Sequence, residues 1–289
     1  MKTYLYFLLS WLFLTTAEAA PMKVVTTFSI LMDLVKQVGG EDVSVQAIVG
    51  PNEDAHVFDP TPQHSLMIAN ADIVFVNGLG LEGWIDRLIE ASGFTGPIVT
   101  VSNGINSLQS PDNATPDPHA WHSIPAVMIY IDNIATALSK KNPENASKYF
   151  QRATSFKQRL RLLNEWIIDE VDKIDPKKRK VITAHDAFQY FAKEYKIQFL
   201  APVGISTQTE PTPRAVLDLI RLIQKENIKI IFVENITNEK QMHMIRESTN
   251  ARIGGTLYSD ALSTSDGPAS DYISLMKHNV GLIVKAMNY

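Results

Sequence analysis

Residues 143–174 carry one long, uninterrupted helical pattern in the middle of the chain. Apolar residues recur there every three or four positions, which is the spacing of one face of an amphipathic helix. Pro143 suits the first turn, Asn142 is a candidate N-cap, and Asp175 followed by Pro176 is expected to end the helix. About 30 residues extend roughly 45 Å. Such a helix either joins two lobes in place of a flexible linker or packs within one large domain.

Short β-branched runs alternate with amphipathic stretches on both sides of this segment. The runs are rich in Val and Ile and are bounded by Gly, Asn, Asp or Pro, which is typical of buried strands. Strands are predicted at 23–28, 43–48, 73–77 and 97–101, and again at 180–184, 197–201, 229–234 and 252–257. Helices are predicted at 30–38, 62–69, 81–91 and 125–139, and again at 187–195, 213–226, 239–249 and 269–287. The alternation predicts an α/β fold with two similar halves, each a parallel sheet covered by helices.

The first 19 residues have the composition of a secretory signal peptide. Lys2 supplies a positive charge, an apolar run follows over 4–14, and Ala17-Glu18-Ala19 fits a cleavage site. The apolar run has about half of the roughly 20 residues that a membrane-spanning helix needs. We therefore expect a signal peptide over 1–19, an N-terminal β/α lobe over 20–142, a connecting spine helix over 143–175 and a C-terminal β/α lobe over 176–289.

The composition excludes several classes of protein. Of the 289 residues, 45% are hydrophobic and 20% are charged, which is ordinary for a packed globular protein and unlike a disordered or low-complexity chain. The net charge of −4 provides no basic surface for nucleic acid. The sequence contains no cysteine, so neither a disulfide nor a thiol-linked lipid is expected. These features predict a freely soluble periplasmic protein of a Gram-negative cell, without a direct membrane anchor.

Four residues follow predicted strand ends, where open α/β sheets place their binding loops. His56, His119 and His185 each have an aspartate and an aromatic residue close by in the sequence, and Asp260 follows the last predicted strand. Two of the four belong to each half. More than 60 residues separate each of them from the next, which is too far for a zinc finger or any local metal loop. They can form one site only if the fold brings the two halves together.

Imidazole nitrogens with one carboxylate oxygen suit zinc, manganese or iron. Four protein ligands leave no open coordination position, which favours holding an ion over catalysis with it. The nearby aspartates Asp54, Asp117 and Asp186 are candidates to orient the imidazoles. The alternative is a periplasmic zinc-dependent hydrolase that uses the same four residues. It would need an open position and a general base, for which Glu53 and Glu234 are the candidates.

Several strings carry a resemblance to a known family. Between residues 24 and 84 they are TTFSIL, VGPNEDAHVFDPTPQ and ADIVFVNGLGLEGW, and further along they are DPHAW, TAHDAFQYFAKEY, EPTPR and GGTLYSDALS. With these motifs the sequence resembles the zinc and manganese substrate-binding proteins of bacterial ABC importers. The resemblance covers nearly the whole chain after the predicted signal peptide.

The resemblance implies two Rossmann-like lobes with parallel sheets, joined by one long rigid spine helix, with a metal ion between them. Carried over position by position, the ligands are His56, His119, His185 and Asp260. The third position holds either His or Glu in the family, and His185 matches the zinc-associated members and some that accept both metals. The implied cargo is Zn²⁺, with Mn²⁺ next. The implied partner is an inner-membrane ABC permease, and the protein is expected to be a monomer, not an enzyme.

Two features depart from the pattern of the family. Many zinc-specific relatives have a long His-rich loop before the second ligand, whereas residues 103–118 are few and contain no histidine. His122 adds an imidazole where an apolar residue is more usual. It could be a spare ligand, but we expect it to be solvent-exposed or hydrogen-bonded. The remaining histidines, His64, His243 and His278, are expected at the surface.

Overall fold

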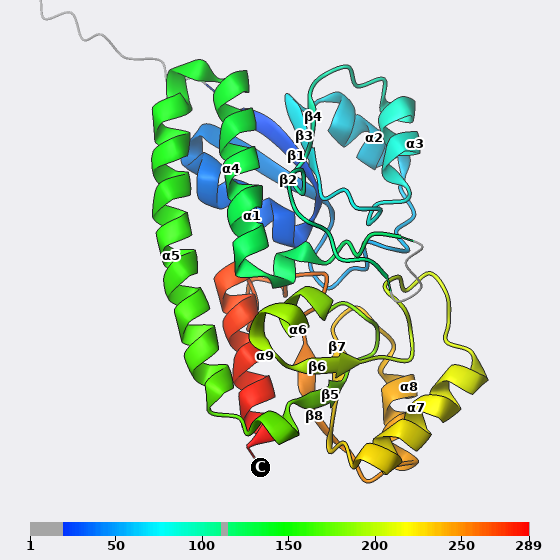
Figure 1. The fold of residues 1–289 in the computed structure, drawn as a ribbon. Helices are drawn as coiled ribbons and strands as arrows, with labels where there is room; N and C mark the ends of the chain where they lie inside the picture. The colour runs from blue at the N-terminus through cyan, green and yellow to red at the C-terminus, as the bar shows by residue number, and fades with distance from the viewer. Residues whose placement is uncertain (1–19, 111–114, 289) are drawn as a thin grey trace, which may run out of the picture.

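The computed structural model describes residues 20–110 and 115–288. The predicted signal peptide lies outside these residues. The described part of the chain contains two four-stranded parallel sheets with helices around them, which confirms the predicted fold class (Figure 1). The first sheet contains β1 (Met22–Phe28), β2 (Val43–Val49), β3 (Ile73–Val76) and β4 (Ile98–Thr100). The second contains β5 (Lys180–Ile182), β6 (Gln198–Leu200), β7 (Ile230–Glu234) and β8 (Arg252–Leu257).

The two sheets repeat one topology. Their strand orders are β2-β1-β3-β4 and β6-β5-β7-β8, so in each sheet the first strand lies between the second and the third. Val24 of β1, for example, pairs with Val45 on one side and Ile73 on the other. Because every strand pair is parallel, the carboxyl ends of the strands in a sheet lie at the same edge. The loops at that edge are the ones that contain the predicted site residues.

Nine α-helices surround the two sheets in the described residues. In the first half they are α1 (Ser29–Gly39), α2 (Pro62–Ala69), α3 (Ile85–Ser92) and α4 (Ile124–Lys141). The long helix is α5 (Ala146–Asp172), and α6 (Gln189–Tyr195), α7 (Pro213–Glu226), α8 (Glu239–Glu247) and α9 (Tyr272–Met287) follow it. None of them combines the length and the apolar character that a membrane span requires.

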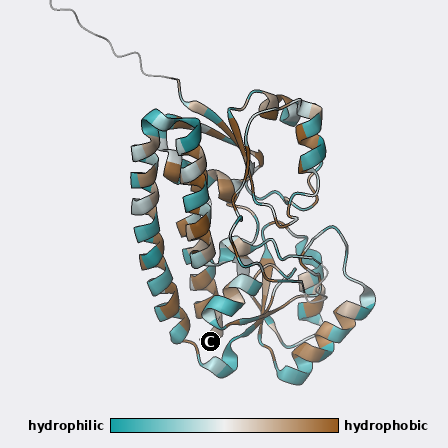
Figure 2. Cartoon of the chain, turned by 45° about the horizontal axis from the view of Figure 1, so that its top comes forward, coloured by the Kyte–Doolittle hydropathy of each residue, from teal (hydrophilic) through white to brown (hydrophobic). Residues whose placement is uncertain are grey.

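The long helix α5 runs beside both sheets (Figure 1). It packs on α1 and α4 in the first half and on α6 and α9 in the second. Buried side chains such as Tyr149, Phe156 and Ile167 form its inner face, while hydrophilic residues predominate on its outer side (Figure 2). The helical segment begins at the predicted residue, with Pro143–Asn145 as a 3₁₀ turn that leads directly into α5. Asn142 does not cap it, and its side-chain amide donates instead to the Tyr149 hydroxyl at 3.4 Å.

One continuous hydrophobic core extends through both halves. It includes residues of β1, α1 and α4 together with residues of α5, α6 and α9. The last helix, expected to belong to the second half alone, also contacts α1. There the buried Asp33 carboxylate accepts a hydrogen bond from the Tyr272 amide at 2.9 Å, and burial raises the pKa of Asp33. A smaller cluster lies between the second sheet and helices α7 and α8. This sharing of one core restricts motion of the two sheets relative to each other.

Candidate metal centre

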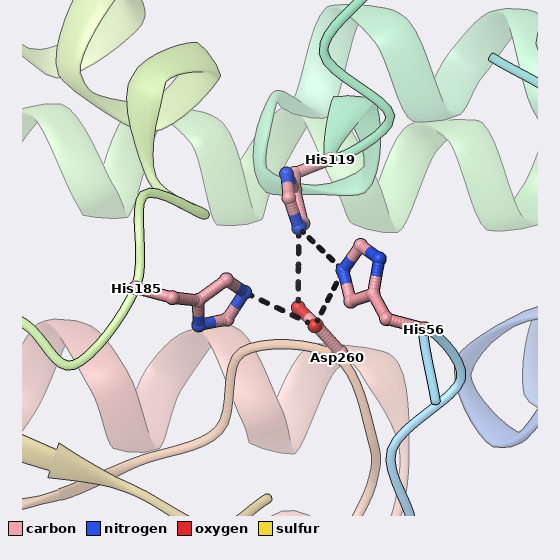
Figure 3. Close-up of side chains that lie close together, drawn as sticks. All are labelled: His56, His119, His185 and Asp260. Carbon is pink, nitrogen blue, oxygen red and sulfur yellow. Dashed lines mark hydrogen bonds and ion pairs between the residues drawn. The ribbon is translucent and has the colours of Figure 1, made fainter. Parts of the chain in front are cut away.

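His56, His119, His185 and Asp260 converge between the two sheets (Figure 3). One nitrogen or oxygen atom from each lies within 4.8 Å of those of the other three, and all four side chains are buried. Nε2 of His56 is 3.3 Å from Nε2 of His119 and 3.3 Å from Oδ2 of Asp260. Nε2 of His185 is 3.2 Å from the same oxygen. Ligands about 2.0–2.1 Å from a tetrahedral ion lie about 3.3 Å apart, which is close to these three separations.

Each of these residues lies in a loop after a strand, as the sequence predicts. His56 follows β2, His119 follows β4, His185 follows β5 and Asp260 follows β8. The loops are fixed by hydrogen bonds from their surroundings. The Trp84 indole donates to the carbonyl of Ala55 at 2.8 Å, next to His56. The Trp121 indole donates to the carbonyl of Ser259 at 2.8 Å, next to Asp260.

Two of the imidazoles have a buried carboxylate behind them. Oδ1 of Asp117 is 2.7 Å from Nδ1 of His119, and Oε2 of Glu234 is 2.6 Å from Nδ1 of His185. A carboxylate in this position holds the proton on Nδ1 and leaves Nε2 free to bind a cation. The other oxygen of Glu234 accepts hydrogen bonds from the amides of Ala184 and His185 at 2.7 and 3.0 Å. This carboxylate therefore fixes both the ring and the backbone of His185.

The orienting residues match the sequence prediction only in part. Asp117 orients an imidazole as expected, but Asp186 accepts from the Gln189 side chain, and Asp54 accepts from the amide of His56 rather than from its ring. Glu234 takes the orienting position at His185 instead. The signal for this role in the sequence is a glutamate at the end of a buried strand, and Glu234 orients an imidazole there rather than serving as the expected general base.

The charges at the centre are strongly coupled. Burial opposes ionisation of Asp260, but the imidazoles of His185 and His119 outweigh it and hold the pKa of Asp260 well below its usual range. Burial likewise opposes protonation of His185, but the carboxylates of Glu234 and Asp260 outweigh it and hold the pKa of His185 well above its usual range. The centre is thus built to place positive charge beside the Asp260 carboxylate.

The hydrolase alternative finds no support in this geometry. Both oxygens of Glu234 are bound to His185 and its backbone, so neither is free to activate water. Glu53 accepts a hydrogen bond from the amide of Gly50 at 2.7 Å, within its own turn. The hydrogen bonds of both candidate bases therefore engage them elsewhere, and neither is placed to accept a proton from water at the four convergent side chains.

His122 contradicts the expectation of an exposed or hydrogen-bonded side chain. Its imidazole is fully buried, with its ring centre 4.5 Å from that of Phe188. Neither ring nitrogen makes a hydrogen bond of standard geometry with the residues that the structure describes, although the Ser259 backbone is near enough to favour the protonated ring slightly. Burial, followed by the neighbouring His119, lowers the pKa of His122 to about 3. His122 is not one of the four convergent residues.

The other three histidines lie away from the centre. His243 is exposed, while His64 and His278 are half-buried. Nδ1 of His64 accepts a hydrogen bond from the Thr61 amide at 2.9 Å at the start of α2. Nε2 of His278 donates to the carbonyl of Thr256 at 3.0 Å.

Comparisons with known proteins agree with this fold. The family model described as the periplasmic zinc-uptake complex component A, ZnuA, matches residues 24–286. The chain is 32% identical to the manganese-binding lipoprotein MntA of Halalkalibacterium halodurans, over 95% of this chain and 91% of the relative. It is 31% identical to the iron-binding protein YfeA of Yersinia pestis, over 92% and 86%. The solved structure of the periplasmic zinc-binding protein TroA from Treponema pallidum superimposes with a TM-score of 0.89 at 27% identity, covering 92% of this chain and 99% of TroA. The chain therefore belongs to the ZnuA family of periplasmic metal-uptake components.

Proposed function

We propose that this protein captures a divalent transition-metal cation in the periplasm, with Zn²⁺ preferred and Mn²⁺ next, and delivers it to an inner-membrane ABC permease. The observation that carries the proposal is the convergence of three imidazole Nε2 atoms and one carboxylate in a buried centre. His56, His119, His185 and Asp260 would be the ligands. With all four positions taken by the protein, the centre holds the ion and catalyses no reaction.

The preference for zinc rests on the donor set. Three neutral imidazoles and one carboxylate leave a divalent ion with a net charge of +1, and the Irving–Williams order ranks zinc above manganese at nitrogen-rich sites. The relatives are named for manganese, iron and zinc, so the family alone leaves the cargo open.

The location and organisation of the protein are part of the proposal. The lobes would span 20–142 and 176–289, with the spine over 143–175, and the protein would act as a monomer. Relatives such as MntA are named lipoproteins, whereas this sequence contains no cysteine that could accept a lipid. We therefore propose an unanchored periplasmic form.

Competition titration of metal-free protein with Zn²⁺ and Mn²⁺ tests the proposal. Free zinc at a hundredfold excess over its dissociation constant should add about 2.7 kcal/mol to the free energy of unfolding, because only the folded state holds the ion. Tighter binding of manganese would overturn the preference. Absence of both a melting shift and a bound ion in elemental analysis would overturn the function. The His185→Glu variant, with an oxygen donor at the third position, should shift the preference towards manganese.

Replacing Glu234 by glutamine should weaken zinc binding about 10- to 100-fold, although residue 234 does not itself face the ion. The amide keeps the shape of the side chain but loses the negative charge that fixes the His185 tautomer and raises the basicity of Nε2. Isothermal titration with a competing chelator would measure the change. Glu53→Gln is the matched control and should bind zinc as the unaltered protein does. Equal affinity for zinc in both variants would show that Glu234 does not support metal binding.

A further inference from the structure

His56 is held in place differently from the other members of the centre. His119 and His185 each have a buried carboxylate behind Nδ1, from Asp117 and Glu234. Nδ1 of His56 has no hydrogen bond among the residues that the structure describes. The imidazole of His56 also lies nearest to solvent, since 3% of the residue is exposed and its neighbour Val57 is 52% exposed. His56 is therefore the outermost member of the centre and the one whose ring is least fixed.

Hydrogen bonds from the opposite half of the molecule hold the loop of His56. The Thr207 hydroxyl donates to Oδ2 of Asp54 at 2.6 Å, and the other oxygen of Asp54 accepts from the amide of His56 at 2.8 Å. The Gln208 side-chain amide donates to the carbonyl of His56 at 3.0 Å. Thr207 and Gln208 thus contact the peptide groups on both sides of the His56 Cα atom, one directly and one through Asp54. We name these two residues the 207–208 clamp.

The chain segment that contains the clamp also pairs with a member of the centre. It belongs to the irregular segment between β6 and α7, and Val203 at the start of this segment forms a parallel bridge with His185. The amide of Asp186 donates to the carbonyl of Gly204 at 3.1 Å. One segment of the second half is therefore paired with His185 at one point and bonded to the His56 loop at another.

A cavity lies beside the clamp. Its volume is about 330 Å³, and its lining includes Thr207, Glu210 and Gln241, with Asp54 and His185 on the side of the centre. Gln208 itself is exposed, as are Thr209 and Glu210 after it. Among the described residues, Thr207 and Gln208 each donate one side-chain hydrogen bond to the His56 loop, and neither bonds to the carboxylates behind His119 and His185.

We propose that Thr207 and Gln208 are positioning residues that hold His56 on the bound ion from the opposite half and thereby set the rate at which the ion leaves. This inference rests on the proposed function as a metal carrier. Neither residue touches the ion. They act on His56, the outermost member of the centre, so their effect should appear mainly in the rate at which the ion dissociates. Most changes in affinity between related complexes occur in this rate.

Stopped-flow measurement of zinc release tests the inference. Zinc-loaded full-length protein is mixed with an excess of a fluorescent zinc chelator, and the dissociation rate is read directly. Loss of a hydrogen bond to a carboxylate in Thr207→Val should raise this rate about tenfold, and Gln208→Met should raise it about fivefold. Thr207→Ser, which retains the hydroxyl, should restore a rate close to that of the unaltered protein. Thr209→Val, on the same exposed segment, is the matched control and should release zinc at the unaltered rate.

Two further measurements separate positioning from a general structural role. In a His56→Ala background, Thr207→Val should no longer change zinc affinity, because the ligand through which it acts is gone. The association rate of zinc should be nearly unchanged in Thr207→Val, because the other three ligands stay in place. An association rate that falls as much as the dissociation rate rises, or an unchanged effect in the His56→Ala background, would overturn the inference. If the unaltered protein binds zinc and Thr207→Val releases it at the normal rate, this inference fails while the proposed function stands. If the unaltered protein binds no zinc, the proposed function itself fails.

Discussion

Replacing Asp260 by asparagine is expected to weaken zinc binding on the order of a thousandfold. Asp260 is the single carboxylate among the four convergent residues, and its oxygens lie 3.2–3.7 Å from the three imidazoles. Asparagine preserves the volume and one oxygen but removes the negative charge that balances a buried dication. Breaking a buried charge pair costs about 3–5 kcal/mol, which corresponds to roughly two to four powers of ten in affinity.

Chelator competition with Zn²⁺ measures this loss, and the metal-free protein shows whether folding is intact. Both carboxylate oxygens of Asp260 are buried without a hydrogen-bond donor apart from the imidazoles that face them. The asparagine variant should melt somewhat lower than the unaltered protein when metal is absent, because it loses the attraction between the carboxylate and the imidazoles, but it should still unfold in one cooperative transition. Asp266→Asn is the matched control, since Asp266 is exposed on the segment that follows. A loss of less than threefold in Asp260→Asn would show that Asp260 does not bind the ion.

The elements of the fold were predictable where local chemistry specifies them. Helices α2 and α7 begin at the predicted residues because each has a threonine N-cap followed by proline in the first turn, and both end at an asparagine C-cap. Helix α3 begins later than predicted. The buried Glu82 carboxylate accepts hydrogen bonds from the amides of Asn77 and Gly78 at 2.6 and 3.1 Å, which holds residues 78–82 in a loop. Nothing in the local sequence distinguishes that carboxylate from one on the exposed face of a helix.

The four convergent residues could be predicted because each belongs to a polar motif that follows a predicted strand. His56, His119, His185 and Asp260 lie together as expected because parallel strands bring their carboxyl ends to one edge. Contacts between distant segments were not predictable. Glu234 reaches His185 across 49 positions, and Gln208 reaches the His56 carbonyl across 152. Only the assembled fold reveals such partners.

His122→Leu should stabilise the metal-free protein, and the gain should grow as the pH falls. The imidazole is buried with no well-formed hydrogen bond at either nitrogen, and its contact with the Ser259 backbone is too weak to offset burial, an arrangement that costs about 1 kcal/mol and that leucine removes. The pKa of His122 is about 3 in the folded protein, against about 6.5 in an unfolded chain. Between these values the unfolded state binds a proton that the folded state does not. Histidine therefore lowers the stability by about 1.4 kcal/mol for each pH unit below about 6.5.

Urea unfolding of the metal-free protein at pH 8 and pH 5 measures both parts of this effect. At pH 8 the leucine variant should be more stable by about 1 kcal/mol, and at pH 5 by about 3 kcal/mol. The other histidines are common to both proteins, so the widening difference belongs to residue 122. His243→Gln, on the exposed surface of α8, removes the same number of histidines and should show no widening. A constant difference at the two pH values would mean that His122 becomes protonated inside the fold, and that a proton-accepting partner lies beside it.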